Sequence, residues 1–133
     1  MAERHFSPAE VEALIPALNG IMQRVMPAHA EAAGIRERMQ AEQQRITLSG
    51  GGMIDPDAWR ADRERLGQLA RRLREGLEAI GALGGVPKDL SLGLVDFPHL
   101  RAGDEVNLCW KYGEASIGFW HGLDEGYGGR RPL

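Results

Sequence analysis

Residues 108–129, LCWKYGEASIGFWHGLDEGYGG, organise the second half of the chain and are its densest run of unusual residues. They include the only cysteine, Cys109, two of the three tryptophans, and His121. Two strand-like runs lie on either side of a turn at Gly113 and Glu114, because polar and apolar residues alternate there with a period of two. This stretch therefore predicts a strand–turn–strand unit followed by a glycine-rich tail.

Further strands are expected on both sides of this turn. Residues 94–97 form the first clear strand, which we expect to end at Pro98, and residues 101–104 form a turn. Residues 105–112 and 117–121 are the next two strands. The face of residues 105–112 that we expect to pack on helices carries Val106, Leu108, Trp110 and Tyr112. Together these segments predict a three- or four-stranded antiparallel β-meander.

The N-terminal part of the chain has a helical pattern. Residues 7–10, SPAE, form a capping box with proline at the first helical position. Apolar residues then recur every three or four positions over residues 11–46, interrupted only by Glu42. Pro16 and Pro27 each remove a helical hydrogen bond. We therefore predict one long, kinked helix, with a break near Pro27 as the alternative.

A second helix is predicted from an Asp55-Pro56 start to about Ile80. The uncharged residues 47–54, with three consecutive glycines, connect the two helices. Six arginines in the second helix are matched by six acidic residues, which favours a solvated face with short-range ion pairs over a nucleic-acid surface. Two apolar helix faces joined by a short loop predict an antiparallel helical hairpin.

These elements define the expected fold. We predict a single α+β domain over residues 1–133, with the long antiparallel helical hairpin at 7–81 and the glycine-rich β region and tail at 82–133. The first helix is longer than the second, so its N-terminal end needs another partner. We expect the C-terminal region to pack on residues 11–22.

Composition excludes several classes of function. The chain has 133 residues, 43% of them hydrophobic and 26% charged, with a net charge of −3, as in ordinary globular proteins. That charge does not favour binding to nucleic acid or anionic membrane. One cysteine cannot form an internal disulfide, and from the residue pattern we expect neither a signal peptide nor a membrane span. We expect a cytoplasmic protein without a nucleic-acid or membrane partner.

Several motifs point to a family. In chain order they are FSPAEVEALIP (6–16), GLVDFP (93–98), LCWKYGE (108–114), IGFWH (117–121) and DEGYGGR (124–130). With these motifs the chain resembles a prokaryotic family known as domain of unknown function 2203, over essentially its whole length. The resemblance implies no activity, substrate or ligand. It implies that the motif positions belong together: Asp96, Phe97, Cys109, Trp110, Gly113, Glu114, Trp120, His121, Gly126 and Arg130.

The C-terminal motifs contain the candidate functional residues. The candidate cluster is Asp96, Cys109, Trp110, Glu114, Trp120, His121, Asp124, Glu125 and Arg130. Cys109 with His121 could form a thiolate nucleophile if the two share a face of the sheet. His121 with Asp96 and Glu114, or with Asp124 or Glu125, could hold a divalent ion such as zinc, manganese or iron.

The same residues have a structural interpretation. Asp96, Glu114 and His121 can cap turns and pair with Arg130 or Arg131, which would hold the tail on the sheet. The aromatic residues can form the core of the sheet, or line a small-ligand pocket whose arginine would favour an anionic group.

Two functions from different classes follow. The favoured one is a non-enzymatic structural or interaction module that forms a homodimer through its helices. The alternative is a small-molecule or divalent-metal-binding protein, enzymatic or not, with its site around His121, Glu114 and Asp96. No cofactor is favoured, and a divalent metal is the candidate for the alternative.

Overall fold

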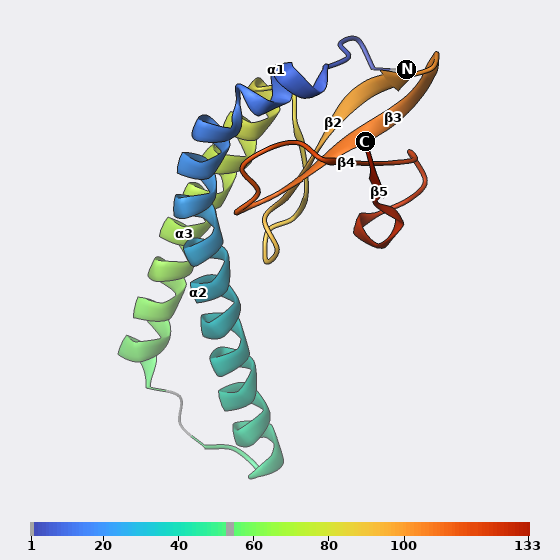
Figure 1. The fold of residues 1–133 in the computed structure, drawn as a ribbon. Coiled ribbons are helices and arrows are strands. Elements are labelled where there is room, and N and C mark those ends of the chain that lie inside the picture. The colour runs from blue at the N-terminus through green and yellow to red at the C-terminus, as the bar shows by residue number, and fades with distance from the viewer. Residues whose placement is uncertain (1, 53–54) are drawn as a thin grey trace.

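A helical hairpin followed by a five-stranded antiparallel sheet makes up the protein (Figure 1). The computed structural model describes residues 2–52 and 55–133. The architecture confirms the predicted α+β class, although the sheet has five strands where three or four were expected. None of the helices within the described residues is long and apolar enough to cross a membrane.

The first predicted helix is divided near its start. Helix α1 (Pro8–Glu12) has the expected capping box, in which Ser7 Oγ accepts from the Glu10 amide at 3.1 Å and Glu10 Oε1 accepts from the Ser7 amide at 3.0 Å. Helix α2 (Ile15–Leu48) follows after a two-residue break, with proline in its first turn. The predicted single long helix is therefore two helices, divided just before Pro16, and the alternative of a break near Pro27 is wrong.

The positions of the two prolines explain this outcome. Pro16 lies in the first turn of α2, where an amide hydrogen would have no helical acceptor. Pro27 is inside α2 but is exposed, so water can satisfy the carbonyl that its missing amide leaves free. The helix also continues to Leu48, two residues into the predicted connector; Met53 and Ile54 of that connector lie outside the described residues.

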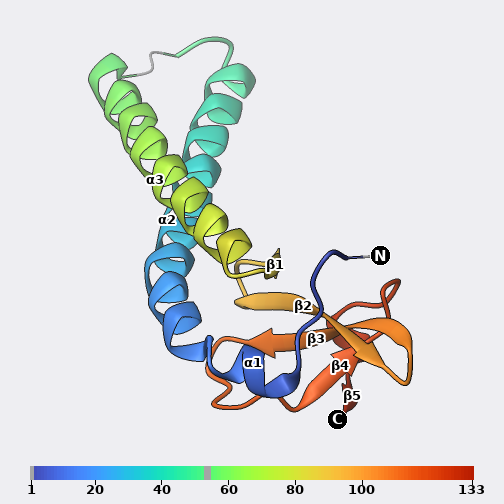
Figure 2. The same ribbon diagram turned by 90° about the horizontal axis from the view of Figure 1, so that it is seen from above.

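Helix α3 (Pro56–Ala82) begins at the predicted cap, since Asp55 accepts from two amides of the first turn. It packs against α2, and the two helices cross and then separate toward the connector (Figure 2). Gly76, which does not fit the apolar pattern of α3, is buried at the crossing. A side chain there would overlap Val25 of α2, so only glycine allows the helices to approach this closely.

The sheet contains its strands in chain order. They are β1 (Val86–Asp89), β2 (Leu94–Arg101), β3 (Asp104–Lys111), β4 (Phe119–His121) and β5 (Arg131–Pro132). All neighbouring pairs are antiparallel, as the meander prediction requires. β1 and β5 were missed because both are short edge strands with a proline and without alternation.

Two strand boundaries differ from the prediction. β2 does not end at Pro98 but continues through it to Arg101. Because β1 pairs with β2 only as far as Asp96, Pro98 lies on an open edge where no amide is needed, and its carbonyl accepts from the Phe6 amide at 2.7 Å. β4 begins at Phe119, not at residue 117, since the Ile117 amide donates to Glu12 at 3.1 Å instead of to a strand.

One face of the sheet, the inner face, packs on the helices. Its buried residues are Val95, Phe97, Leu108 and Trp110. They share a core with helical residues that include Val11, Ile15, Leu18 and Met22. This confirms the expectation that the C-terminal region packs on residues 11–22. A second, smaller cluster of Ala28, Ala32, Ile35 and Leu69 holds the middle of the hairpin together.

Candidate metal site

The opposite face of the sheet, the outer face, brings three chemically active residues together. Asp96 comes from β2, Cys109 from β3 and His121 from β4. Asp96 is paired with Cys109, and His121 with Asn107. Paired residues share a face, and so do residues two apart on one strand, so all three side chains lie on the outer face. One carboxylate oxygen of Asp96, Sγ of Cys109 and one ring nitrogen of His121 lie within 4.8 Å of one another.

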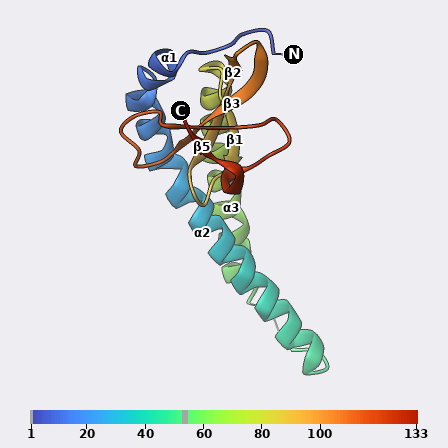
Figure 3. The same cartoon turned by 45° about the vertical axis from the view of Figure 1, so that its right-hand side comes forward.

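This group is buried although it lies on the face away from the helices. Asp96 and His121 are each 2% exposed, and Cys109 is 1% exposed. In Figure 3 the chain after β4 passes over the face of the sheet that is turned away from α2 and α3. Arg130 of this segment stacks on Phe119, which is on the same face as His121. The C-terminal tail is therefore the cover of the site.

The hydrogen bonds of His121 define where its protons lie. Nδ1 is 2.8 Å from the carbonyl oxygen of Gly122, and because a carbonyl only accepts, Nδ1 carries a hydrogen. Nε2 is 3.0 Å from Asp96 Oδ2. Two acceptors cannot face each other at that distance without a proton or a cation between them. The Asp96–His121 pair therefore holds one shared proton, or a metal ion in its place.

Asp96 is the least satisfied of the three groups. Neither carboxylate oxygen has a well-aligned hydrogen bond, even though Oδ2 is close to His121. The carboxylate has lost its hydration on burial and has only the His121 ring and the Cys109 thiol beside it, so its burial is costly. The carboxylate is thus available to a cation, and the Nδ1–carbonyl bond of His121 orients Nε2 as in metal-binding histidines.

Cys109 does not have the properties of a free nucleophile. Burial raises the pKa of its thiol to about 12, and the negative charge of Asp96 acts in the same direction. The positive charge of Arg130 opposes this shift but does not cancel it. A protonated, buried thiol is inert toward most electrophiles, so sharing a face with His121 is not enough for nucleophilic catalysis. A metal ion could still displace the proton and bind the sulfur.

Glu114 is not part of this group. Both of its oxygens lie 2.8 Å from Arg130 Nη2, and Oε1 also accepts from the Lys111 amide at 2.7 Å. The structural interpretation thus holds for Glu114 and Arg130, which attach the tail to the sheet. It does not hold for Asp96 and His121, which contact each other. Of the three predicted metal candidates, the structure brings together Asp96 and His121 and adds Cys109.

The other candidate residues have structural contacts. Trp110 is in the core and donates from Nε1 to the Glu114 carbonyl at 3.0 Å. The guanidinium carbons of Arg101 and Arg131 lie 4.7 and 4.8 Å from the centre of the Trp120 ring. Asp124 is exposed. None of these residues contributes a ligand atom to the buried group.

Glu125 holds the start of the tail. Its Oε1 accepts from the Gly122 amide, and its Oε2 pairs with Arg131, both at 2.8 Å. Sequence reasoning missed one member of the site, the Gly122 carbonyl that orients His121. A backbone acceptor carries no side-chain signal, so the sequence had no means to identify it.

Fold and site together define a class of protein: an α+β protein whose helical hairpin supports a small antiparallel sheet with a buried Asp–Cys–His group. A family model described as "Uncharacterized conserved protein (DUF2203)" matches residues 4–133. The chain belongs to this family, as its motifs indicated. No curated protein and no solved structure matches the chain.

Proposed function

We propose that this protein binds a divalent transition-metal ion of the zinc class through Asp96, Cys109 and His121. The observation that carries the proposal is the buried Asp96 carboxylate, which has no aligned hydrogen bond and faces Nε2 of an already oriented histidine. Burying a carboxylate is costly, and a bound divalent cation would compensate its charge in place of the proton that it otherwise shares with His121.

The set of donor atoms suits zinc better than magnesium or calcium. Sulfur and imidazole nitrogen are ligands of borderline and soft ions, whereas hard ions take oxygen alone. A thiolate, a carboxylate and a neutral imidazole would balance two positive charges. Tetrahedral zinc places its ligand atoms roughly 3–4 Å apart, so the observed 4.8 Å limit requires only small side-chain adjustments.

Metal analysis of the purified protein tests the proposal. We expect one zinc ion per chain after reconstitution and dialysis, and a thiolate-to-metal absorption band when cobalt replaces zinc. His121→Ala and Cys109→Ser should lose the metal, whereas His29→Ala, which removes a histidine of α2, should keep it. Metal at the same stoichiometry in all variants would mean that the ion binds elsewhere, and no metal in the wild type would refute the proposal.

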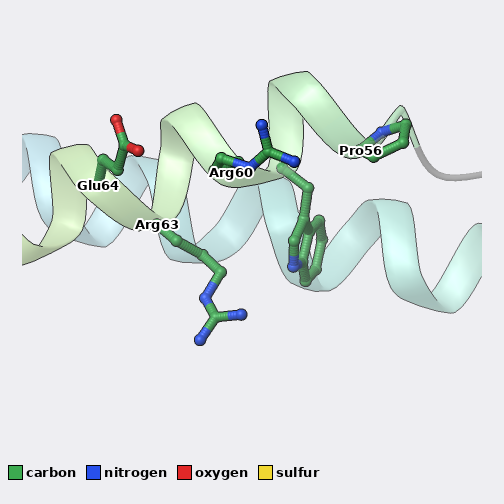
Figure 4. Close-up of a pocket in the computed structure, with 5 residues that line it drawn as sticks. Pro56, Arg60, Arg63 and Glu64 are labelled. Carbon is green, nitrogen blue, oxygen red and sulfur yellow. The ribbon is translucent and has the colours of Figure 1, made fainter.

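A second candidate function is self-association through the far end of the hairpin, away from the sheet. Leu48 at the end of α2 is 88% exposed, and Trp59 in the first turns of α3 is half-buried. A hollow of about 600 Å³ beside Trp59 is lined by Pro56, Arg60, Arg63 and Glu64 as well (Figure 4). No residue of the two core clusters lies beyond Met39 of α2 or before Leu66 of α3.

Charge supports a second copy of the chain as the partner. Residues 36–48 of α2 contain three arginines and two glutamates, whereas residues 55–66, the cap and first turns of α3, contain three arginines and four acidic residues. In an antiparallel pair of hairpins, the slightly basic α2 end of one copy would meet the slightly acidic α3 end of the other. The protein would then be a non-enzymatic, cytoplasmic homodimer, with the metal ion stabilising its sheet.

Light scattering after size exclusion tests this candidate. We expect a dimer mass at micromolar concentration, and a monomer for Leu48→Glu. Because Leu48 has almost no contacts within the chain, this variant should keep its fold. A strict monomer in the wild type would exclude self-association, and an unchanged dimer in Leu48→Glu would exclude this surface.

A further inference from the structure

The C-terminal tail is attached to the sheet through Arg130, which lies between η1 (Tyr127–Gly129) and β5. Its side chain is 10% exposed and reaches back to β3. One nitrogen, Nη2, donates to the Cys109 carbonyl at 3.2 Å and to both oxygens of Glu114 at 2.8 Å. The guanidinium carbon is also 4.1 Å from the Phe119 ring and 4.9 Å from the Tyr127 ring.

This attachment shares a residue with the buried group. The carbonyl of Cys109 holds Arg130, while Sγ of the same residue points into the group with Asp96 and His121. A charge-assisted bond to a partly buried carboxylate is among the stronger contacts that a side chain can make. Arg130 thus links the tail to a residue of the site itself.

The rest of the tail is weakly held. β4 has only two paired positions with β3, and two with β5. Residues 123–128 are exposed, and the Glu125–Arg131 pair that spans them is also accessible to solvent. Exposed ion pairs contribute little to stability. The Glu114–Arg130 contact is therefore the principal polar link that keeps this segment over the site.

We propose that the C-terminal tail is a strap that controls how fast the metal enters and leaves, and that Arg130 is the positioning residue that keeps it closed. This inference rests on the metal binding proposed above. A group that is 1–2% exposed cannot exchange an ion with solvent unless its cover moves. Short strand pairings and the Arg130 contacts hold the strap over the site, so its opening is the path of exchange.

Metal-exchange kinetics test the proposal. Zinc-loaded protein is mixed with an excess of a chromophoric chelator, and zinc release is followed with time; uptake is measured separately with metal-free protein. In Arg130→Met both uptake and release should become roughly 10-fold faster or more, because loss of the charge-assisted contact raises the population of the open tail. A residue that only supported a ligand would speed release alone, so a parallel change in both rates identifies a gate.

Two further variants sharpen the test. Arg131→Met removes a tail arginine whose partner, Glu125, is outside the site, and it should exchange zinc at the wild-type rate. Arg130→Lys should return both rates toward those of the wild type, because one nitrogen suffices for the observed contacts. If Arg130→Met does not fold, Glu114→Gln weakens the same Glu114–Arg130 contact by changing the other partner. The rates of zinc uptake and release in that variant then test the proposal.

The outcomes separate this inference from the proposed function. Wild-type exchange rates in Arg130→Met or in Glu114→Gln, with stoichiometric zinc still bound, would overturn the strap and leave metal binding intact. Faster release without faster uptake would also overturn it. A wild-type protein that takes up no zinc would refute the proposed function and the strap together.

Discussion

The two faces of the sheet are both buried, but different physical effects hold them. The inner face places Phe97, Leu108 and Trp110 against the helices, and none of the three is exposed. The outer face places Asp96 and His121 under a tail of twelve residues that is mostly loop. The inner face therefore gains free energy from apolar burial, whereas the outer face pays a desolvation cost that its own contacts must offset.

The stability of the outer face depends on a bound proton or ion, whereas that of the inner face does not. Apolar contacts do not depend on a proton or an ion. The contact between Asp96 and His121 needs one or the other, because two acceptors face each other there. A buried pair of this kind adds little stability compared with apolar residues of the same size, and breaking it is costly. Such a site is therefore better explained by binding than by folding.

The largest effect is expected on the inner face. Trp110→Ala should lower the free energy of unfolding by about 3–5 kcal/mol, because it leaves a large cavity and removes the bond to the Glu114 carbonyl. Urea unfolding measures this loss. Leu48→Ala, at an exposed position, should change stability by less than about 0.5 kcal/mol. Equal losses in both variants would contradict the assigned core.

The next effect concerns the outer face without metal. His121→Ala should cost about 3 kcal/mol, because it leaves the Asp96 carboxylate buried and unpaired. Asp96→Leu combined with His121→Leu should recover much of that loss, since an apolar pair has no charge to compensate. Urea unfolding in the presence of a chelator compares the variants. If the double variant were as unstable as the single one, packing rather than charge would govern this face.

Zinc should then stabilise one face selectively. At a free concentration of roughly 100 times the dissociation constant, the gain in unfolding free energy should be about 2.7 kcal/mol. Thermal unfolding with and without zinc detects it as a rise in Tm. The rise should persist in His29→Ala and disappear in Cys109→Ser. A rise of the same size in Cys109→Ser would show that sulfur is not a ligand.

The smallest effect is a pH dependence of the metal-free protein. The Cys109 thiol has a pKa of about 12 in the fold, against an ordinary value of 9.0. Between these values the unfolded chain loses the thiol proton and the folded chain keeps it. Stability is thus fully present below about pH 9 and falls as pH rises, by at most roughly 1.4 kcal/mol per pH unit.

Comparison with Cys109→Ala separates the contribution of the Cys109 thiol to the pH dependence of stability from that of other ionisable groups. The variant should lose stability less steeply between about pH 9 and pH 10 than the wild type does, in urea unfolding with a chelator present. Identical slopes would mean that the thiol is not held protonated by its surroundings. The outer face would then be more accessible to water than the structure indicates.

Much of the fold could be predicted from short stretches of sequence. The capping box at Ser7, the Asp55 cap and the alternation in residues 105–112 are local signals, and each element formed where the signals indicated. Their lengths also predicted which part of α2 would meet the sheet. Among the strands, the failures were at β1, β5, Pro98 and the start of β4, where contacts with a distant segment decide whether a residue is in a strand.

The site was only partly predictable, for the same reason. Asp96, Cys109 and His121 were all candidates. The sequence did not determine, however, on which face of the sheet His121 lies. The pairing of His121 with Asn107 decided it, and this pairing joins residues of different strands. Glu114 was expected at the site because it is an acid close in sequence, but Arg130 binds it instead.

The sequence by itself determined the helical hairpin, the meander and the family, because periodicity, caps and motifs are properties of neighbouring residues. Only the tertiary structure decided which three side chains meet under the tail. Strand register has a period of two, and a shift by one residue would turn His121 to the inner face. The register is fixed by the packing of the inner face on the helices, and this packing is far from the three side chains that the register brings together.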